Sequence, residues 1–464
     1  PTQQEDGRLW LRTARMQVCV QTSPLRLSFF DHNGRLLTQE AAGAWWAGGQ
    51  LGVSLTCRED EHFLGLGEYG DHIDRRGQSQ EMWVVHSYSA KDIPVPFVLS
   101  SRGWGLLWCN SFRGSVNVCP GQMDTVSCRA EGGEIDYFVM CGDEPKDVVS
   151  TYTSLTGRSP LPPKWAFGYW QSRCGWGSQD WALGTAKRLR ADGFPLDVLH
   201  MDGWSDGDLR FSSARFAGAQ GMLDELRSMG VKVCIWETPF VAQGWRMYAE
   251  GNRRGYFATD AEGRTLPVTA WVGDGLGLLD FLNPAACAWW QAAHRSVLSM
   301  GIGVVKTDGG DTAEVPEKAV FFGRKTGHEV HNLYPLLFNH CVYEGQQRER
   351  PGQRVINWTR TGYAGIQRYP CTWGGDQAST FEGGRTLVRA GINAGVCGIA
   401  FWGHDLGGFA AGRTKEYYVR SCQWGFLSPL SRIHGTGENV DRAIDGNEPW
   451  VYGSEAEEII RRYA

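Results

Sequence analysis

The stretch "GIGVVKTDGGD", residues 301–311, places Lys306, Asp308 and Asp311 directly after a run of small and β-branched residues. Such a run is typical of a buried β-strand, and acids at its end lie at the carboxyl edge of a sheet or barrel, where α/β enzymes hold their reactive groups. An Asp followed by two glycines is also typical of a helix cap or a turn. On this stretch alone, a catalytic role and a capping role for Asp308 fit equally well.

A second acid, Asp376 in "WGGDQ", also stands beside glycines at the end of a short apolar segment. Cleavage of a glycosidic bond needs two carboxyl groups on either side of that bond, and small neighbours let a substrate approach them closely. The pair Asp308 and Asp376 therefore indicates glycoside hydrolysis. If the reaction retains the anomeric configuration, we expect their carboxyl groups about 5 to 6 Å apart.

A metal site is the alternative use of the acids and histidines. His200 and Asp202 stand two apart on one predicted strand and so share a face, and His404 precedes Asp405. Barrels that hydrolyse with metal usually supply two His from one strand and further His later, and that set is incomplete. Hydrogen bonding to a neutral polyol is the better use of mixed His, Asp and Arg. The GxGxxG match "GLGEYG" lacks the following helix that a phosphate needs. We expect neither a metal nor an organic cofactor.

The elements that must position these residues change character along the chain. Residues 1–160 contain short alternating segments separated by Gly, Asn and Pro, which predicts a β-sandwich domain. Residues 161–464 alternate strands with helices, beginning with "WAFGYWQS" and a helix over about 180–192. Eight strand candidates with crossovers predict a (β/α)8 barrel. Nearly all of them end in polar groups: Arg173, Asp202, Glu237, Asp308, Arg360, Asp376, His404 with Asp405, and Arg432 with His434.

Bulk composition narrows the class. Among 464 residues, 42% are hydrophobic and 21% charged, as in ordinary globular proteins, and no apolar run is long enough to cross a bilayer. A net charge of -5 with dispersed basic residues gives no footprint for nucleic acid. The 13 cysteines are scattered without CxxC pairs, which favours reduced thiols and a cytoplasmic setting. The 21 tryptophans suit the apolar faces of sugars, although most must be core. The composition does not distinguish a monomer from an oligomer.

The sequence strongly resembles family 31 of the glycoside hydrolases, the group of α-glucosidases and α-xylosidases. The resemblance rests on matching stretches in order along the chain: "GLGE", "PPKWAFGYW", "LDVLHMD", "KVCIWETPF", "DFLNP", "VVKTDGGD", "HNLYP", "WTRTGYAGIQRYPCTWGGD", "FWGHDLGGF" and "LSPLSRIHG". It implies Asp308 as nucleophile and Asp376 as general acid/base. It further implies that Asp202, Arg360, Asp405 and His434 hold hydroxyl groups of the sugar, directly or through a neighbour, and that Trp236 and Trp402 wall the first subsite. We expect Lys306 and Trp373 to belong to the same substrate-binding set.

The resemblance implies a retaining, exo-acting α-glycosidase that needs no cofactor and binds a small carbohydrate. "FWGHDLGGF" and "HNLYP" are closer to the bacterial α-xylosidase branch. An α-glucosidase or transglucosylase, and an inactive carbohydrate-binding fragment, remain the alternatives. We expect Trp204 or the loop Arg173–Trp176 to exclude the hydroxymethyl group of glucose. We expect the chain to begin inside the sandwich and "EAEEIIRRYA" to lie within the last barrel helix, after which family members usually continue into further β-domains.

Overall fold

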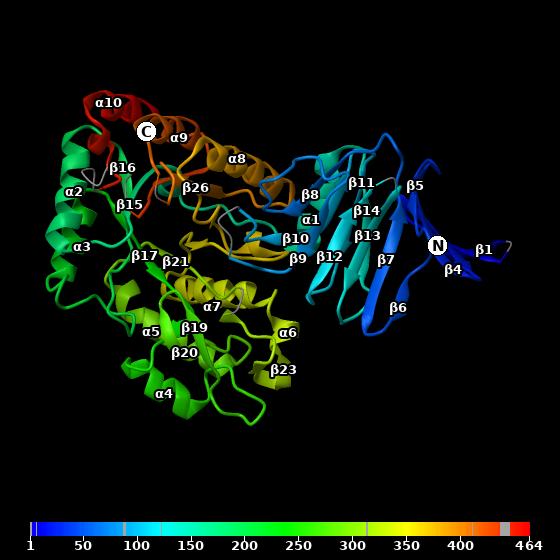
Figure 1. The fold of residues 1–464 in the computed structure, drawn as a ribbon, viewed down its shortest axis with the longest axis horizontal. Helices are drawn as coiled ribbons and strands as arrows, with labels where there is room; N and C mark the ends of the chain where they lie inside the picture. Colours follow the sequence, from blue (N-terminus) through cyan, green and yellow to red (C-terminus); the bar gives the residue numbers. More distant parts are fainter. Residues whose placement is uncertain are drawn as a thin grey trace.

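The computed structural model describes residues 2–5, 7–86, 90–121, 123–311, 314–410, 412–436 and 446–464, with the side chains of residues 2–5 left aside. Figure 1 shows two regions along the long axis of the molecule: antiparallel sheets at the amino-terminal end, and helices around a barrel at the other. The carboxyl terminus lies beside the barrel helices α9 (Lys415–Gly425) and α10 (Ser454–Tyr463).

The amino-terminal region consists of antiparallel sheets, as its alternating pattern predicts. Two of them face each other across one apolar core that includes Leu51, Val53, Trp104 and Val116, so they form a sandwich. Their strands are β14 (Tyr137–Cys141), β11 (Trp104–Trp108), β10 (Pro94–Ser100) and β8 (Phe63–Gly67) in one sheet, and β6 (Trp45–Ala47), β7 (Gln50–Thr56), β13 (Thr125–Ala130), β12 (Gly114–Val118) and β9 (Ser79–Met82) in the other. A further sheet holds β1 (Thr2–Glu5), β2 (Arg8–Arg12), β3 (Met16–Thr22), β4 (Leu25–Asp31) and β5 (Leu36–Gln39).

The second region is a closed barrel of parallel strands, which confirms the predicted (β/α)8 architecture after an amino-terminal sandwich. Each strand is short and almost wholly buried, as expected where helices cover the outer face. In order around the barrel the strands are β15 (Tyr169–Arg173), β16 (Leu196–Met201), β17 (Lys232–Glu237), β21 (Val304–Thr307), β24 (Ile356–Thr359), β25 (Thr372–Trp373), β26 (Trp402–Leu406) and β27 (Leu430–Ile433).

Helices connect these strands. The helix expected over about 180–192 is α2 (Gln179–Ala191), and the Ser178 hydroxyl caps it by accepting a hydrogen bond from the Trp181 amide. The others are α1 (Pro145–Thr156), α3 (Ala219–Ser228), α4 (Arg246–Arg254), α5 (Pro284–Ser299), α6 (Gly327–Val330), α7 (Tyr334–Glu349) and α8 (Phe381–Val396), with short 3-10 turns at η1 (Lys164–Phe167), η3 (Phe322–Arg324), η4 (Ile366–Arg368) and η5 (Pro449–Tyr452). Within the described residues, no helix combines the length and the apolar character that a membrane crossing requires.

Additional strands extend the loops that follow β17 and β21. Strand β18 (Phe240–Val241) pairs with β20 (Gly273–Leu278), which pairs with β19 (Pro267–Ala270). Strands β22 (Val320–Phe321) and β23 (Lys325–Thr326) form a small hairpin. Both additions follow the carboxyl ends of barrel strands, the face on which barrel proteins build their sites.

The interior of the barrel is filled mainly by indole rings. Trp170, Trp358 and Trp373 come from three different strands, and their neighbouring ring centroids are 4.7 Å and 6.4 Å apart. Since side chains alternate along a strand, these residues mark which positions of β15, β24 and β25 point inward. Because of the same alternation, the residue that follows each of these tryptophans points outward, toward the helices. The position of a charged residue in this alternation therefore decides whether its side chain reaches the site.

Asn332 joins the sandwich to the barrel region. Its side-chain oxygen accepts a hydrogen bond of 2.8 Å from the Val84 amide, and its side-chain nitrogen donates to the carbonyls of Met82 and Ser111, both at 3.1 Å. Asn332 itself is fully buried. A buried polar group that loses its partner costs about 1–3 kcal/mol, so this side chain contributes strongly to the contact between the regions.

We therefore expect Asn332→Ala to lower the free energy of unfolding by about 2–4 kcal/mol, because it leaves buried backbone groups of the sandwich without partners. Urea unfolding followed by circular dichroism measures the change. Asn33→Ala, at an exposed turn, is the matched control and should stay within about 0.5 kcal/mol of the parent. An equally small effect at Asn332 would contradict this account of the contact.

Candidate functional site

A cavity of about 550 Å³ opens at the carboxyl end of the barrel. This size falls within the range of small-molecule sites. The residues expected from the sequence that line it are Asp202, Trp236, Lys306, Asp308, Arg360, Asp376 and His434. They come from or directly follow six different strands, so the barrel brings together residues more than 200 positions apart in the chain.

Arg360 connects the two acids that the sequence singled out. Its Nε lies 2.8 Å from Asp308 Oδ1, and its Nη2 donates to Asp308 Oδ2 at 3.3 Å and to Asp376 Oδ2 at 2.9 Å. Burial alone would lower the pKa of Arg360, but the negative charges of Asp308 and Asp376 outweigh it and raise that pKa above its ordinary value. The guanidinium therefore stays charged and holds both carboxylates on one side of the cavity.

Trp236 supplies a second donor to Asp308. Its indole Nε1 donates to Asp308 Oδ2 at 2.8 Å, and the Asp308 amide donates to the Glu237 carbonyl at 2.9 Å. The side chain and the backbone of Asp308 are thus both fixed by the end of β17, the neighbouring strand. Asp308 is 4% exposed, and it lines the cavity.

Asp202 lies among imidazoles on another side of the cavity. His200 Nε2 is 2.8 Å from Asp202 Oδ1, and His434 Nε2 is 3.4 Å from Oδ2. Burial by itself would raise the pKa of Asp202, but the positive charge of Lys306 and the contact with His200 hold it well below its usual range. Burial lowers the pKa of His200 to about 4, and burial together with Arg432 lowers the pKa of His434. Asp202 is therefore an ionised acceptor between neutral rings, which suits hydroxyl groups.

Trp373 and Asp405 lie beneath the cavity and outside its lining. The Trp373 ring supports three cations: Lys306 Nζ is 4.4 Å from its centroid, and the guanidinium carbons of Arg360 and Arg432 are both at 5.5 Å. Asp405 forms a buried ion pair with Arg432. Both residues act on the cavity through these cations.

Trp402 does not lie in the cavity wall, in contrast to the expectation from the sequence. Its indole Nε1 donates to Glu68 Oε1 of the sandwich at 2.6 Å, and its ring packs against Gly391 of α8. The reason is the alternation along β26, which turns Asp405 inward and Trp402 outward. Arg173, Glu237 and His404 also point outward, so the ring of charged strand ends that the sequence suggested is smaller than expected. Arg173 packs over Trp181 of α2, and His404 stacks on Trp424 of α9.

Several cavity residues carried no usable signal in the sequence. His86 comes from the sandwich; its ring contacts Arg360 Nη1 and lies 4.0 Å from Asp376 Oδ2. Trp271, between β19 and β20, stacks at 6.1 Å on His86 and is 51% exposed. Val272, beside Trp271, also lines the cavity. Nothing in the local sequence around Trp271 indicated that its loop would fold over the barrel.

Only some of the residues expected to exclude the hydroxymethyl group of glucose line the cavity. Cys174 and Gly175 line the cavity, whereas Trp176 and Trp204 are each 1% exposed and point away from it. Trp176 donates to the His200 carbonyl at 2.9 Å, and Trp204 donates to the Trp236 carbonyl at 2.7 Å. Among the residues that the structure describes, no group of three or more His, Cys, Asp or Glu side chains is arranged to hold a metal ion.

The fold and the site together define a (β/α)8-barrel protein with paired carboxylates in a small cavity at the carboxyl ends of its strands. The chain belongs to glycosyl hydrolase family 31. Residues 159–464 match the domain described as "Glycosyl hydrolases family 31 TIM-barrel domain", and residues 2–117 match the "Glycosyl hydrolase 31 N-terminal galactose mutarotase-like domain".

Named relatives include Alpha-glucosidase 2 of Bacillus thermoamyloliquefaciens, 30% identical over 98% of this chain and 60% of the relative. Alpha-xylosidase XylQ of Lactiplantibacillus pentosus is 31% identical over 95% of this chain and 60% of its own length. The solved structure of a Flavobacterium johnsoniae family 31 dextranase, complexed with isomaltotriose, superimposes with a TM-score of 0.94 at 27% identity, covering 100% of this chain and 60% of that one. The chain thus spans about 60% of the length of these relatives.

The outward position of His404 predicts a specific pH dependence of stability. Its ring is fully buried, and neither ring nitrogen has a hydrogen-bond partner within the described part of the chain. Burial lowers its pKa to about 3. Between that value and the ordinary one near 6.5, the unfolded chain binds a proton that the folded chain does not, so stability falls as the pH is lowered.

Replacing His404 with Phe removes this contribution. Between pH 7 and pH 5 the parent should lose about 2 kcal/mol more unfolding free energy than His404→Phe, as measured by urea titration at both values. His32→Phe, at an exposed position, should follow the parent. Identical pH dependence of His404→Phe and the parent would show that the folded state tolerates a charged His404.

Proposed function

We propose that this chain contains the catalytic barrel of a retaining, exo-acting α-glycoside hydrolase, with α-xylosidase-like specificity. Because the chain covers about 60% of the relatives above, the activity of the whole protein is part of the proposal. Residues 1–160 would form the supporting sandwich domain and residues 161–464 the barrel. The presence of both Asp308 and Asp376 supports catalysis over the alternative of an inactive carbohydrate-binding fragment.

The spacing of the two acids is the observation that carries this proposal. The bonds from Asp308 Oδ2 and Asp376 Oδ2, 3.3 Å and 2.9 Å long, end on the same nitrogen, Arg360 Nη2. The two oxygens are therefore no farther apart than the two lengths together. That limit is shorter than the roughly 6.5–9.5 Å that an inverting pair needs to admit a water molecule. The geometry supports a nucleophile and an acid in one retaining pair.

In the proposed reaction, Asp308 attacks the anomeric carbon while Asp376 protonates the oxygen of the leaving group. A covalent glycosyl-Asp308 ester results, with the anomeric configuration inverted once. Asp376, now a carboxylate, removes a proton from water, which attacks the same carbon and inverts it again. Arg360 and the Trp236 indole orient Asp308 before attack, and Asp202 accepts hydrogen bonds from sugar hydroxyls.

The proposed sugar rests on the loop after β15, whose residues Cys174 and Gly175 line the cavity. Cys174 and Gly175 would narrow the space beside the ring carbon that bears the hydroxymethyl group in glucose. A packed wall that must accommodate an extra hydroxymethyl group costs a few kcal/mol, which favours xylose. Relatives with both names, α-xylosidase and α-glucosidase, resemble this chain, so α-glucosidase or transglucosylase activity is the second candidate.

A reducing, cytoplasmic setting belongs to the same proposal. It is supported by the 13 cysteines, all of which are free thiols and most of which are buried. In buried sites such as Cys128 and Cys234 burial raises the pKa of the thiol, so the reactive thiolate is disfavoured. The partner we propose is a small carbohydrate.

The two acids should respond differently to substitution. Asp308→Ala should abolish turnover of nitrophenyl α-glycosides, and azide should restore it by forming the β-glycosyl azide, because azide occupies the place of the missing nucleophile. Asp376→Ala should keep measurable activity only on substrates with good leaving groups, since these need no proton. Asp274→Ala, an exposed acid near the cavity, is the matched control. Equal loss on all leaving groups in Asp376→Ala would assign the acid to another residue.

The sugar assignment is tested by comparing kcat/KM for nitrophenyl α-xyloside and α-glucoside. We expect at least a tenfold preference for the xyloside, and a smaller preference in Cys174→Ala, which enlarges the cavity beside the sugar. Cys57→Ala, a buried thiol of the sandwich, serves as control. A clear preference of the parent for the glucoside would refute α-xylosidase specificity while leaving the two-acid mechanism intact.

A further inference from the structure

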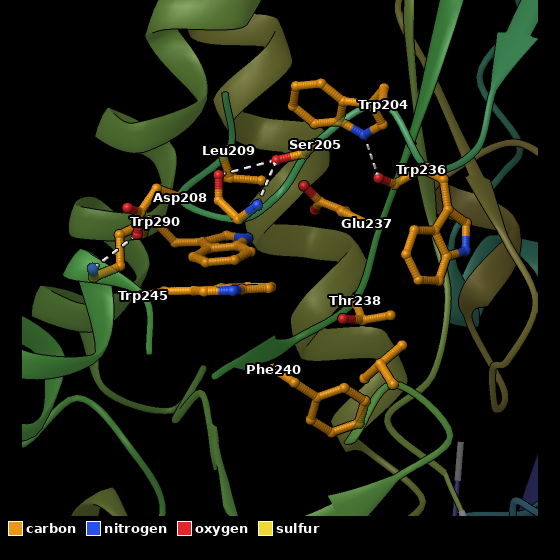
Figure 2. Close-up of a pocket in the computed structure, with 14 residues that line it drawn as sticks. Trp204, Ser205, Asp208, Leu209, Trp236, Glu237, Thr238, Phe240, Trp245 and Trp290 are labelled. Atoms are coloured by element: carbon orange, nitrogen blue, oxygen red, sulfur yellow. Dashed lines mark hydrogen bonds between the residues drawn. The ribbon is translucent and has the colours of Figure 1, made fainter. Parts of the chain in front are cut away.

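A second, smaller chamber lies directly behind Trp236. It has a volume of about 130 Å³ and shares Gly203, Trp236 and Val272 with the cavity described above, so the two spaces are adjacent. Figure 2 shows its lining, which comes from the loop after β16, the end of β17, strand β18, the β19–β20 turn, the start of α4, and α5. No sugar-binding or catalytic role assigned above uses this space.

The chamber wall contains five aromatic side chains. Besides Trp236, the rings of Trp204, Trp245, Trp290 and Phe240 line it, together with Leu209. An apolar cavity of about 150 Å³ holds a molecule of benzene. A chamber of about 130 Å³ therefore has room for one six-membered aromatic ring and little more. A sugar ring, with hydroxyl groups on all sides, would leave most of these groups without partners.

Two polar atoms of the lining have no hydrogen-bond partner among the described residues: the acceptor Glu237 Oε1 and the donor Trp290 Nε1. Both side chains are at least nine-tenths buried, Glu237 with 4% and Trp290 with 2% exposure. In Figure 2 the Glu237 side chain extends from β17 into the space between Trp204 and Trp245. Buried polar atoms of this kind are normally paired, so a partner from outside the chain is expected.

The charge of Glu237 is already balanced. Its other oxygen, Oε2, contacts His294 Nε2 of α5, and His294 Nδ1 lies 2.8 Å from the Trp290 carbonyl. Burial would lower the pKa of His294, but the charge of Glu237 outweighs it and raises that pKa. A ligand in the chamber therefore does not need a positive charge. The chamber offers one hydrogen-bond acceptor, Glu237, and one donor, Trp290, to a neutral group.

The wall is fixed by hydrogen bonds and by strained backbone. Asp208 accepts from the amide of Met247 at 2.8 Å and so caps α4. Asp208 and Leu209 have φ values of 57° and 50°, a left-handed conformation that costs non-glycine residues free energy. Gly207 lies so close to Trp245 that an added Cβ would be 2.6 Å from the indole ring. The loop is thus held in a demanding shape that keeps the chamber open.

We propose that this chamber binds a neutral, single-ring aromatic alcohol of the phenol class, with its ring among the indoles and its hydroxyl group paired with Glu237 and Trp290. A hydroxyl group both donates and accepts, which matches the two unpaired atoms, whereas a hydrocarbon of the same size satisfies neither. The proposal is independent of the proposed function. Its occupant would contact Trp236, the residue that donates to Asp308.

Isothermal titration calorimetry with phenol tests the proposal. We expect saturable binding at one site per chain, about tenfold weaker for benzene, since one net hydrogen bond to a charged group contributes on the order of tenfold. Met247→Trp, which fills the chamber from α4, should abolish binding. Met123→Trp, at an exposed position of the sandwich, is the matched control and should bind as the parent does. Binding of benzene as tight as that of phenol would overturn the assignment.

Two further measurements locate the bound phenol. Addition of saturating xylose and glucose should leave phenol binding unchanged, and displacement by either sugar would place phenol in the larger cavity and overturn the proposal. In a protein with ¹⁵N-labelled tryptophan, phenol should shift the Trp290 indole resonance, assigned through Trp290→Phe. This measurement uses the parent protein, so it shows whether phenol binds in the chamber even if Met247→Trp does not fold. A Trp290 resonance that stays fixed at saturating phenol would also overturn the proposal.

Discussion

The contact of Arg360 with both Asp308 and Asp376 is the interaction on which the rest of the site depends. Negative charge on two acids that face each other away from water is strongly repulsive, and the positive charge of Arg360 offsets that repulsion. Arg360 is 4% exposed and has lost nearly all of its hydration, a cost that only several negative partners offset. Asp92 and Asp311 add to the field of the two acids. Cation and acids therefore stabilise one another, and removing any one of them leaves an uncompensated buried charge.

Residues that point away from the cavity hold in place the neighbouring residues that point into it. Thr307 precedes Asp308, and Thr359 precedes Arg360; both point toward α7. Asn339 of α7 accepts from the Thr307 hydroxyl at 2.6 Å and donates to the Thr359 hydroxyl at 2.8 Å. One buried amide thus sets the distance between two neighbouring strand ends. Since hydrogen bonds of this kind tolerate little displacement, the spacing of the acid and the cation is set from behind the barrel wall.

The sequence predicted what depends on local pattern. Local patterns were enough to predict the sandwich, the barrel and the residues around Asp308. These patterns were the period-two alternation, the helix and turn signals, and the recurring charge at strand ends. The direction of individual side chains was harder to predict, because one residue of difference in register turns a side chain from the cavity to the helix layer. Glu237 and Trp402 are such cases. His86 and Trp271 could not be found at all, since their positions depend on how distant loops pack over the barrel.

His86 shows that the sandwich contributes to the site as well as supporting it. Its ring contacts Arg360, and burial together with the charge of Arg360 lowers its pKa, so it lies beside the guanidinium as a neutral ring. Glu68, also in the sandwich, accepts a hydrogen bond from Trp402, the first residue of β26. Burial and the nearby Asp92 raise the pKa of Glu68 well above its ordinary value. Both contacts cross between the two regions close to the two acids. A barrel separated from its sandwich would therefore expose the Arg360 side of the cavity to water, weaken the electrostatic balance of Asp308 and Asp376, and lose the arrangement that places them together.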